Sequence, residues 1–262
     1  MKADIIWLDT ADSTNSVARR HISDIDNLSV LSVMEQTAGR GQRGNTWSSR
    51  PGENLTFSIV LKFTIPGGAE ETLPAVKAHG QFVLTEIASI SVVDFLFKHG
   101  IKAKIKWPND IYVEGKKICG MLIENSVRGN HISSSIIGIG LNINQTNFDV
   151  NLPNPTSMAL CKPDSNFDIR LCLEEFVEIF KDNIVRNLND RTDTETTDTS
   201  LRNTYLKKLW RMNEPSYFHE AASSRKFQGV IRGLSPIGQI MVEDMEKGEL
   251  REFAFKERGY II

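Results

Sequence analysis

A glycine- and arginine-rich segment is the first part of the chain whose residue types could perform chemistry. It reads Gly-Arg-Gly-Gln-Arg-Gly over residues 39–44. The spacing G-x-G-x-x-G occurs in dinucleotide-binding folds, but there a helix follows at once and an acidic residue comes about 20 positions later. Here Pro51 and Gly52 interrupt any such helix. We therefore expect a loop whose backbone N–H groups approach an anion, with Arg40 and Arg43 as charged donors. The alternative is a solvated basic loop.

A second candidate is the sequence Lys-Trp-Pro-Asn-Asp at residues 106–110. Tryptophan beside proline makes a rigid turn, from which Asn109 and Asp110 present an amide and a carboxylate. Asn109 could recognise a base edge, and Asp110 could accept a hydrogen bond from a ribose or hold Mg²⁺. The competing interpretation is a turn in which the Asn and Asp side chains cap their own backbone.

Lys117 is the third candidate. If residues 117–124 form a strand, alternate side chains share a face, and Lys117 lies on the side of Cys119, Met121 and Ile123. An amine among apolar neighbours is costly unless an anion pairs with it. We therefore predict that Lys117 holds a ligand, whereas Lys116 is an ordinary turn lysine.

Glycines recur where a ligand could approach the backbone. Gly120 would leave room on a sheet surface for a flat ligand, and Gly138 and Gly140 interrupt a strand, which marks a bulge or a close approach. Asn142 is the polar group of that segment that we expect to face the ligand.

Two kinds of chemistry are disfavoured. The five histidines have no metal-ligand spacing, so we expect no metal held by His or Cys. No serine lies in a G-x-S-x-G turn, and Cys119 has no histidine nearby in sequence to act as a base, which disfavours a covalent nucleophile.

Composition and net charge exclude further classes of protein. The chain has 262 residues and a formal net charge of -2, which argues against binding nucleic acid or membranes through overall charge. Three scattered cysteines without a Cys-x-x-Cys pair favour reduced thiols in the cytoplasm. Residues 1–10 do not resemble a secretory signal, and no uninterrupted apolar run reaches the ~20 residues of a membrane span.

Hydrophobic periodicity and turn residues predict the elements that position these segments. We expect strands at 5–8, 28–34, 55–63, 104–107, 111–113, 117–124 and 132–142, and helices at 16–22, 73–99, 169–184 and 201–212. Residues 37–54 are expected to form a long loop, and 187–200 a mobile polar link. Five glycines after Pro215 favour a small β-barrel, with a boundary near Asn213.

Taken in order, these segments resemble the catalytic domain of biotin–protein ligases. The motifs that carry the resemblance are Asp12–Asn15, Glu35–Gly44 with Trp47, Lys106–Asp110, Lys117–Gly120 and Gly138–Asn142. They cover about the first 160 residues, and the tail matches the family's C-terminal barrel more loosely. Five motifs in the right order are far more specific than any one of them.

The resemblance implies an α+β fold, with a mixed, largely antiparallel sheet flanked by helices, as in class II synthetases and lipoate ligases. Residues 1–212 would form the catalytic domain and 213–262 a Src-homology-3-like barrel. The implied reaction is ATP-dependent. Biotin and ATP give biotinyl-5'-AMP, and biotin then passes to a lysine of a biotin carboxyl carrier protein. Mg²⁺ would accompany ATP, with Asp110 a candidate ligand.

The resemblance also implies roles for individual residues. Lys117 and Arg40 would be catalytic. Biotin would contact Ser13, Thr14, Asn15, Gln36, Arg40, Gly41, Gln42, Lys117, Gly120 and Leu122. The nucleotide would contact Arg43, Trp47, Lys106, Asn109, Asp110 and Asn142.

Two departures from the family pattern modify these expectations. Many members have arginine at the position of Gln42, so we expect a weaker hold on the adenylate. Only eight residues precede Asp9, so we expect no N-terminal DNA-binding domain. We also expect no nucleic-acid or membrane partner, and a monomer or a homodimer. The alternatives are a lipoate ligase or octanoyltransferase of the same fold, and a non-catalytic biotin-sensing module.

Overall fold

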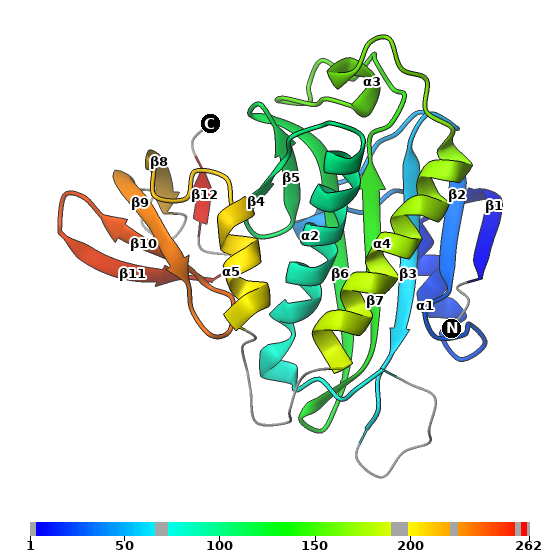
Figure 1. Ribbon diagram of the computed structural model, residues 1–262, viewed down its shortest axis with the longest axis horizontal. Helices are drawn as coiled ribbons and strands as arrows, with labels where there is room; N and C mark the ends of the chain where they lie inside the picture. Colours follow the sequence, from blue (N-terminus) through cyan, green and yellow to red (C-terminus); the bar gives the residue numbers. More distant parts are fainter. Residues whose placement is uncertain (1–3, 66–72, 190–198, 221–224, 255–257, 261–262) are drawn as a thin grey trace.

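The computed structural model describes residues 4–65, 73–189, 199–220, 225–254 and 258–260 (Figure 1). A sheet of seven strands in the order β1-β2-β3-β7-β6-β5-β4 forms its larger part. Its strands are β1 (Ile5–Ala11), β2 (Val30–Gln36), β3 (Leu55–Lys62), β4 (Lys104–Lys106), β5 (Asp110–Val113), β6 (Lys116–Arg128) and β7 (His131–Leu141). β1 pairs with β2 in parallel, and the other neighbours are antiparallel. The predicted mixed, largely antiparallel sheet is therefore confirmed.

The two faces of this sheet are covered unequally. Leu55, Phe57, Ile59 and Leu61 alternate along β3 and join one large hydrophobic core with α2 (Phe82–Lys98) and α4 (Ile169–Asn189). On the opposite face, a small cluster around Val60 packs under α1 (Thr14–Arg20). In Figure 1, α2 and α4 cross in front of the sheet and α1 lies behind it. Because α1 is only seven residues long, much of the rear face is left for a ligand.

Helix α2 is the central core helix. With the 3₁₀ turn before it, it spans Ala78–Lys98 and has the length and hydropathy of a membrane-spanning segment, but 72% of the most apolar window is buried inside the fold. A buried core helix in a globular domain has the same composition.

The predicted start of this helix at Leu73 is wrong. Leu73 instead exchanges backbone hydrogen bonds with Lys62 and Thr64, and Val76 accepts one from Ile132, so the chain runs extended beside the sheet. Only after the 3₁₀ turn Ala78–Gly80 does α2 begin. Sheet pairing outweighs the apolar periodicity of this segment.

The later helices also differ from the prediction at their ends. α4 begins after Asp168, whose carboxylate accepts from the N–H groups of Arg170 and Leu171, as expected for a cap, and it runs to Asn189, into the predicted link. The rest of that link, 190–198, lies outside the described residues. α5 (Thr199–Lys208) stops before Met212 because Trp210 N–H bonds to Ile105 on β4. A short helix, α3 (Met158–Cys161), follows β7.

The C-terminal part forms a second, antiparallel sheet in the order β11-β10-β9-β8-β12. Its strands are β8 (Pro215–Glu220), β9 (Lys226–Leu234), β10 (Ile240–Asp244), β11 (Glu249–Phe253) and β12 (Arg258–Tyr260). The rings of Phe227 on β9 and Phe253 on β11 are 6.3 Å apart. The two rings therefore meet across β10 in the core of this sheet, and a five-stranded antiparallel sheet is consistent with the expected barrel-like module.

The turn between β9 and β10 joins the second sheet to the first. Gly238 O accepts from Trp107 Nε1 at 3.0 Å, and Ser235 O accepts from Arg202 Nη1 at 2.7 Å. Arg202 is itself ion-paired with the buried Glu86 on α2. One hydrophobic cluster extends across this junction. A division into two domains at Asn213 therefore stays a prediction, although β8 begins close by at Pro215.

We expect Gly238→Ala to destabilise the fold strongly. Gly238 has φ +86°, and a Cβ there would lie 2.5 Å from Phe82 Cδ1 and closer still to Cγ. The substitution combines left-handed strain of ~1–2 kcal/mol with overpacking of ~1–3 kcal/mol. Urea denaturation measures the free energy of unfolding. Gly248→Ala is the matched control, because Gly248 has φ +68° with nothing within 4 Å. Equal losses for the two variants would contradict the packing argument.

Candidate functional site

A cavity of about 330 Å³ lies on the rear face of the large sheet, beside α1. Nearly all of the site residues that the sequence predicts line it: Ser13, Thr14, Asn15, Gln36, Arg40, Gly41, Gln42, Trp47, Lys106, Asn109, Asp110, Lys117, Gly120 and Leu122. Gly138 and Gly140, where the sequence predicts a close approach, also line it, and the structure adds Asn45, Thr46, Trp107, Pro108, Met121 and Ile139. Segments more than 100 positions apart in the sequence thus meet in one site.

Two predicted residues are not placed in the cavity. Asn142 does not line it; this residue is buried, and its amide donates to Thr156 O at 2.9 Å. Its role toward a nucleotide therefore remains untested. The side chain of Arg43 lies outside the described part of the chain.

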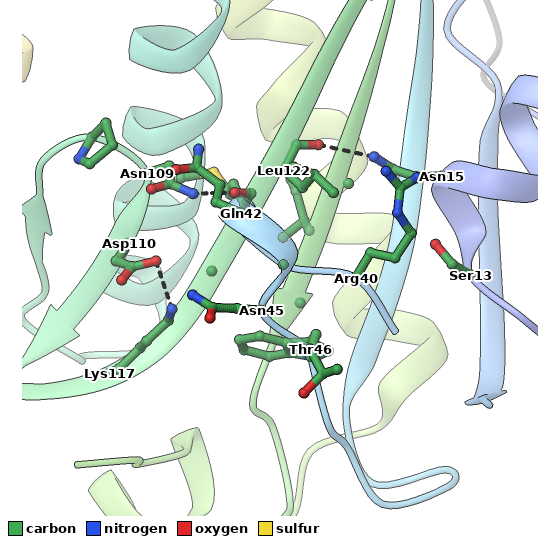
Figure 2. Close-up of a pocket in the computed structure, with 18 of the residues that line it drawn as sticks. Ser13, Asn15, Arg40, Gln42, Asn45, Thr46, Asn109, Asp110, Lys117 and Leu122 are labelled. Atoms are coloured by element: carbon green, nitrogen blue, oxygen red, sulfur yellow. Dashed lines mark hydrogen bonds and ion pairs between the residues drawn. The ribbon is translucent and has the colours of Figure 1, made fainter. Parts of the chain in front are cut away.

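The cavity has two chemically different ends (Figure 2). At one end Lys117 points to Asp110, and the two charged groups are 2.7 Å apart. At the other end lie Ser13, Asn15 and Arg40, while Gln42 and Asn45 come from the loop between them. A ligand that spans the cavity would meet a hydroxyl, an amide and Arg40 at one end and the Lys117–Asp110 pair with Lys106 at the other.

A β-bulge places Lys117 in this site. Opposite β5, Ile111 pairs with Cys119 but Tyr112 pairs with Lys117, so Ile118 is an extra residue in β6. Ile118 and Cys119 are both fully buried. The predicted shared face of Lys117 with Cys119 and Met121 is therefore wrong, because the bulge shifts the alternation by one residue. Lys117 instead lies over Gly120 on the cavity side, with its Nζ 3.1 Å from where a Cβ of Gly120 would be.

Glycines form the floor of the cavity, as predicted, but the groups that approach them belong to the protein. A Cβ on Gly140 would lie 2.5 Å from Trp47 Nε1, and one on Gly120 would lie 3.0 Å from Trp47 Cζ3. The indole of Trp47 therefore rests flat against this floor, 5.7 Å from Lys117 Nζ. Gly138 leaves room in the same way for the amide of Asn15.

The polar end is held by a residue that we did not predict. Ser58 Oγ on β3 lies 2.6 Å from Asn15 Oδ1 and 2.7 Å from Thr14 Oγ1. Gln36 Oε1 accepts from the backbone N–H of Thr14 at 3.0 Å. Ser58 is fully buried. The signal for it was the polar face of β3, where Thr56 and Ser58 alternate with the core residues.

Burial changes the pKa of a lysine at the cationic end of the cavity, which contains Lys106 and Lys117. Desolvation is the main reason that the pKa of the Lys106 ammonium is lowered to about 8. The charges of Lys117 and Arg211 also lower this pKa, whereas the charge of Asp110 raises it. Lys106 Nζ donates to Tyr112 Oη at 2.9 Å, and burial raises the pKa of Tyr112 to about 12. Buried cations of this kind favour an anionic ligand, which would offset their desolvation.

The turn at residues 107–110 is fixed from both sides. Its Trp107–Pro108 peptide is cis. Asn109 donates through its side-chain amide to Met121 O, and its own carbonyl accepts from Met121 N–H at 3.0 Å. The turn therefore does more than cap itself, since it is joined to β6. Among the described residues no group of three His, Cys, Asp or Glu side chains is arranged to hold a metal.

The fold is the one found in biotin protein ligases. The biotin protein ligase of Aquifex aeolicus in complex with biotin and ATP matches 98% of this chain and 97% of its own, with a TM-score of 0.76 and 23% sequence identity. The Helicobacter pylori biotin acetyl coenzyme A carboxylase synthetase with bound biotinylated ATP matches 96% of this chain and 100% of its own, with a TM-score of 0.59 and 19% identity.

The chain belongs to the Biotin/lipoate A/B protein ligase family, whose model matches residues 7–142. It is 27% identical over 234 residues to the biotin–[acetyl-CoA-carboxylase] ligase of Paracoccus denitrificans, covering 88% of this chain and 90% of that protein. It is 35% identical over 147 residues to the bifunctional ligase/repressor BirA of Bacillus spizizenii, covering 55% of this chain. The chain spans about two-fifths of the length of the Bacillus BirA proteins that it matches. The family predicted from the order of the motifs is confirmed.

We expect Gly140→Ala to displace the indole of Trp47, because the added methyl group would overlap it. Moving a buried indole into water shifts its fluorescence emission to longer wavelength. The chain has four tryptophans, so the substitution should be made in the wild type and in a Trp47→Phe background. A red shift in the first and none in the second is expected. Unchanged emission in both would contradict the packing of Trp47 on this glycine.

Proposed function

We propose that the protein is an ATP-dependent biotin–protein ligase. The observation that carries this proposal is one cavity with hydroxyl and amide groups at one end, at Thr14 and Asn15, and the lysines Lys106 and Lys117 at the other. Biotin has a polar ureido ring at one end and a carboxylate at the other, and that carboxylate must meet the α-phosphate of ATP. The names of the relatives and of the matching structures support the same reaction.

In the first step the biotin carboxylate attacks the α-phosphorus of ATP, forming biotinyl-5'-AMP and releasing pyrophosphate. Both partners are anions, so the site must offset their repulsion with positive charge and N–H donors. Lys117 lies at the cationic end and would stabilise the charge that develops on the phosphate. Arg40 and the backbone of Gly41 would close over the intermediate from the loop. The bond between the α-phosphorus and the oxygen that bridges it to the β-phosphorus breaks, and its electron pair leaves with pyrophosphate.

In the second step the ε-amine of an acceptor lysine attacks the mixed anhydride, and AMP leaves. The amine must lose its proton to do so. Among the described residues that line the cavity, Asp110 is the one carboxylate, and we assign it to receive that proton. Its ion pair with Lys117 would hold it beside the reacting atoms.

The remaining assignments are part of the same proposal. Biotin would contact Ser13–Asn15, Gln36, Gly120 and Leu122, and the nucleotide would lie toward Trp47, Lys106 and Asn109. Mg²⁺ would arrive with the ATP and neutralise its phosphates. The acceptor would be a biotin carboxyl carrier protein in the cytoplasm. The weaker hold on the adenylate that Gln42 implies stays a prediction.

The family also includes lipoate ligases, but the polar end favours biotin. Asn15, Thr14 and Ser58 gather an amide and two hydroxyls where the ligand's ring would lie. Such groups match the N–H and C=O of a ureido ring, whereas a dithiolane or octanoyl chain offers them no hydrogen-bonding partner. Calorimetric titration with biotin and with lipoate compares the two ligands directly.

We expect Lys117→Ala to lower the rate of adenylate formation by on the order of 10²–10³-fold, as for loss of a main charge stabiliser. The measurement is pyrophosphate release with biotin and ATP. Lys116→Ala is the matched control, because Lys116 is exposed and does not line the cavity. A Lys117→Ala enzyme with the wild-type rate would disprove the assignment.

We expect ATP affinity to fall as the pH rises from 7 to 9. Lys106 has a pKa of about 8, so its ammonium is charged below that pH and loses its charge above it. Tyr112, with a pKa of about 12, stays protonated over this range. Lys106→Arg should flatten the profile, since guanidinium does not titrate in this range. An unchanged slope in that variant would contradict the assignment of the pH dependence to Lys106.

A further inference from the structure

Glu124, on the cavity side of β6, joins three groups that come from different parts of the chain. Its Oε2 accepts from Asn15 Nδ2 at 2.9 Å, and its Oε1 accepts from Arg40 Nη2 at 3.0 Å. Arg19 on α1 forms an ion pair with the same carboxylate. The carboxylate is 19% exposed. Glu124 therefore connects the polar end of the cavity to the glycine–arginine loop.

Glu124 keeps its charge in this position. Burial alone would raise its pKa, but the hydrogen bond from Asn15 and the charges of Arg40 and Arg19 outweigh burial, so the pKa is lowered. A charged carboxylate gives hydrogen bonds that are shorter and stronger than those of a neutral amide. The contact to Arg40 is therefore a charge-assisted link at neutral pH.

The tip of the loop depends on this link. Among the hydrogen bonds described for residues 39–47, the backbone ones stay within the segment: Gly41 to Asn45, Asn45 to Gln42, and Trp47 to Gly39. Leaving aside Arg43, whose side chain is not described, Arg40 makes the hydrogen bonds that tie the described tip to the sheet. Packing of Trp47 on the glycine floor is the other contact.

We propose that Glu124 is a positioning residue that holds the glycine–arginine loop over the cavity through Arg40 and orients the amide of Asn15 toward the ligand. This inference deepens the proposed function, on which it rests. A bidentate contact uses two of the five guanidinium N–H groups, which leaves the others to donate to an anionic ligand in the cavity that Arg40 lines. Arg40 is thus ordered before the ligand arrives, which lowers the entropic cost of closing the loop.

Arg19, the second arginine that pairs with Glu124, provides a control for the role of Arg40. It shares the carboxylate with Arg40 but does not line the cavity and belongs to α1. Removing Arg19 leaves Glu124 paired with Arg40. Removing Arg40 leaves Glu124 paired with Arg19, so no buried charge is left alone in either variant. The structural cost of the two variants should therefore be similar, and their effects on the loop should differ.

The test compares Glu124→Gln, Arg40→Gln, the double variant and Arg19→Gln. Hydrogen exchange of residues 39–47 is measured on the ligand-free proteins, and the rate of biotinyl-adenylate release is measured after loading with biotin and ATP. We expect Glu124→Gln and Arg40→Gln each to lose exchange protection in the loop and to release the adenylate on the order of tenfold faster, because each variant loses a hydrogen bond between charged groups. In loop protection the double variant should be no worse than Arg40→Gln, and Arg19→Gln should match the wild type in both measurements.

Each outcome bears on one proposal or the other. The positioning role would be overturned if the losses of loop protection in Glu124→Gln and Arg40→Gln were additive, or if either variant kept full loop protection. If Glu124→Gln fails to fold, Arg40→Gln against Arg19→Gln still decides, because equal loop protection in those two would also overturn it. The exchange measurement needs no ligand, so loss of protection in a protein that binds no biotin would support the tether while refuting the ligase proposal.

Discussion

The bulge at Ile118 is the constraint on which the arrangement of the site depends. Along a regular strand Lys117 would face the core with Cys119, where no anion is available to pair with its charge. One extra residue turns Lys117 onto the face of Gly120 while Ile118 and Cys119 both remain buried. The same strand thereby contributes to the core on one face and to the cationic end of the cavity on the other. Glu124, further along β6, then lies at the opposite end of the same ligand site.

The unequal covering of the sheet explains why a cavity exists at all. Two long helices fill the front face, and a single short helix covers part of the rear face. What α1 leaves open is lined by small or polar residues, such as Ser58, Gly138 and Gly140. Larger side chains there would collide with Asn15 and Trp47. The glycines weaken the strands they occupy, but the hydrogen bonds with β3 and β6 on either side of β7 keep them in register.

Much of the fold and most of the site could be predicted, because both are encoded locally. Apolar residues alternate along β3 and mark its core face, and the glycines at 115 and 129, both with positive φ, stand in the tight turns that pair β5, β6 and β7. What was missed depends on tertiary contacts. The bulge at Ile118 has no turn residue to mark it. Residues 73–77 were predicted as helix because an apolar pattern does not reveal that this segment pairs with residues at the ends of β3 and β7. Ser58 and Glu124 belong to no motif, and only the folded sheet brings them to Asn15.

The charges of the site follow one rule at both ends of the cavity. Asp110 is paired with Lys117, and Glu124 is paired with Arg40, so both of these cations have a carboxylate partner before any ligand binds. Unpaired cations would bind anions more tightly but would be costly to bury and free to move. A carboxylate partner weakens that attraction somewhat and fixes the direction of the cation. For a reaction between two anions, placing the positive charge accurately matters more than its amount, because only charge aimed at the transition state lowers the barrier. Lys106 is a different case, since burial above all, and then the charges of Lys117 and Arg211, lower the pKa of its ammonium. An incoming phosphate would offset the cost of burying that charge.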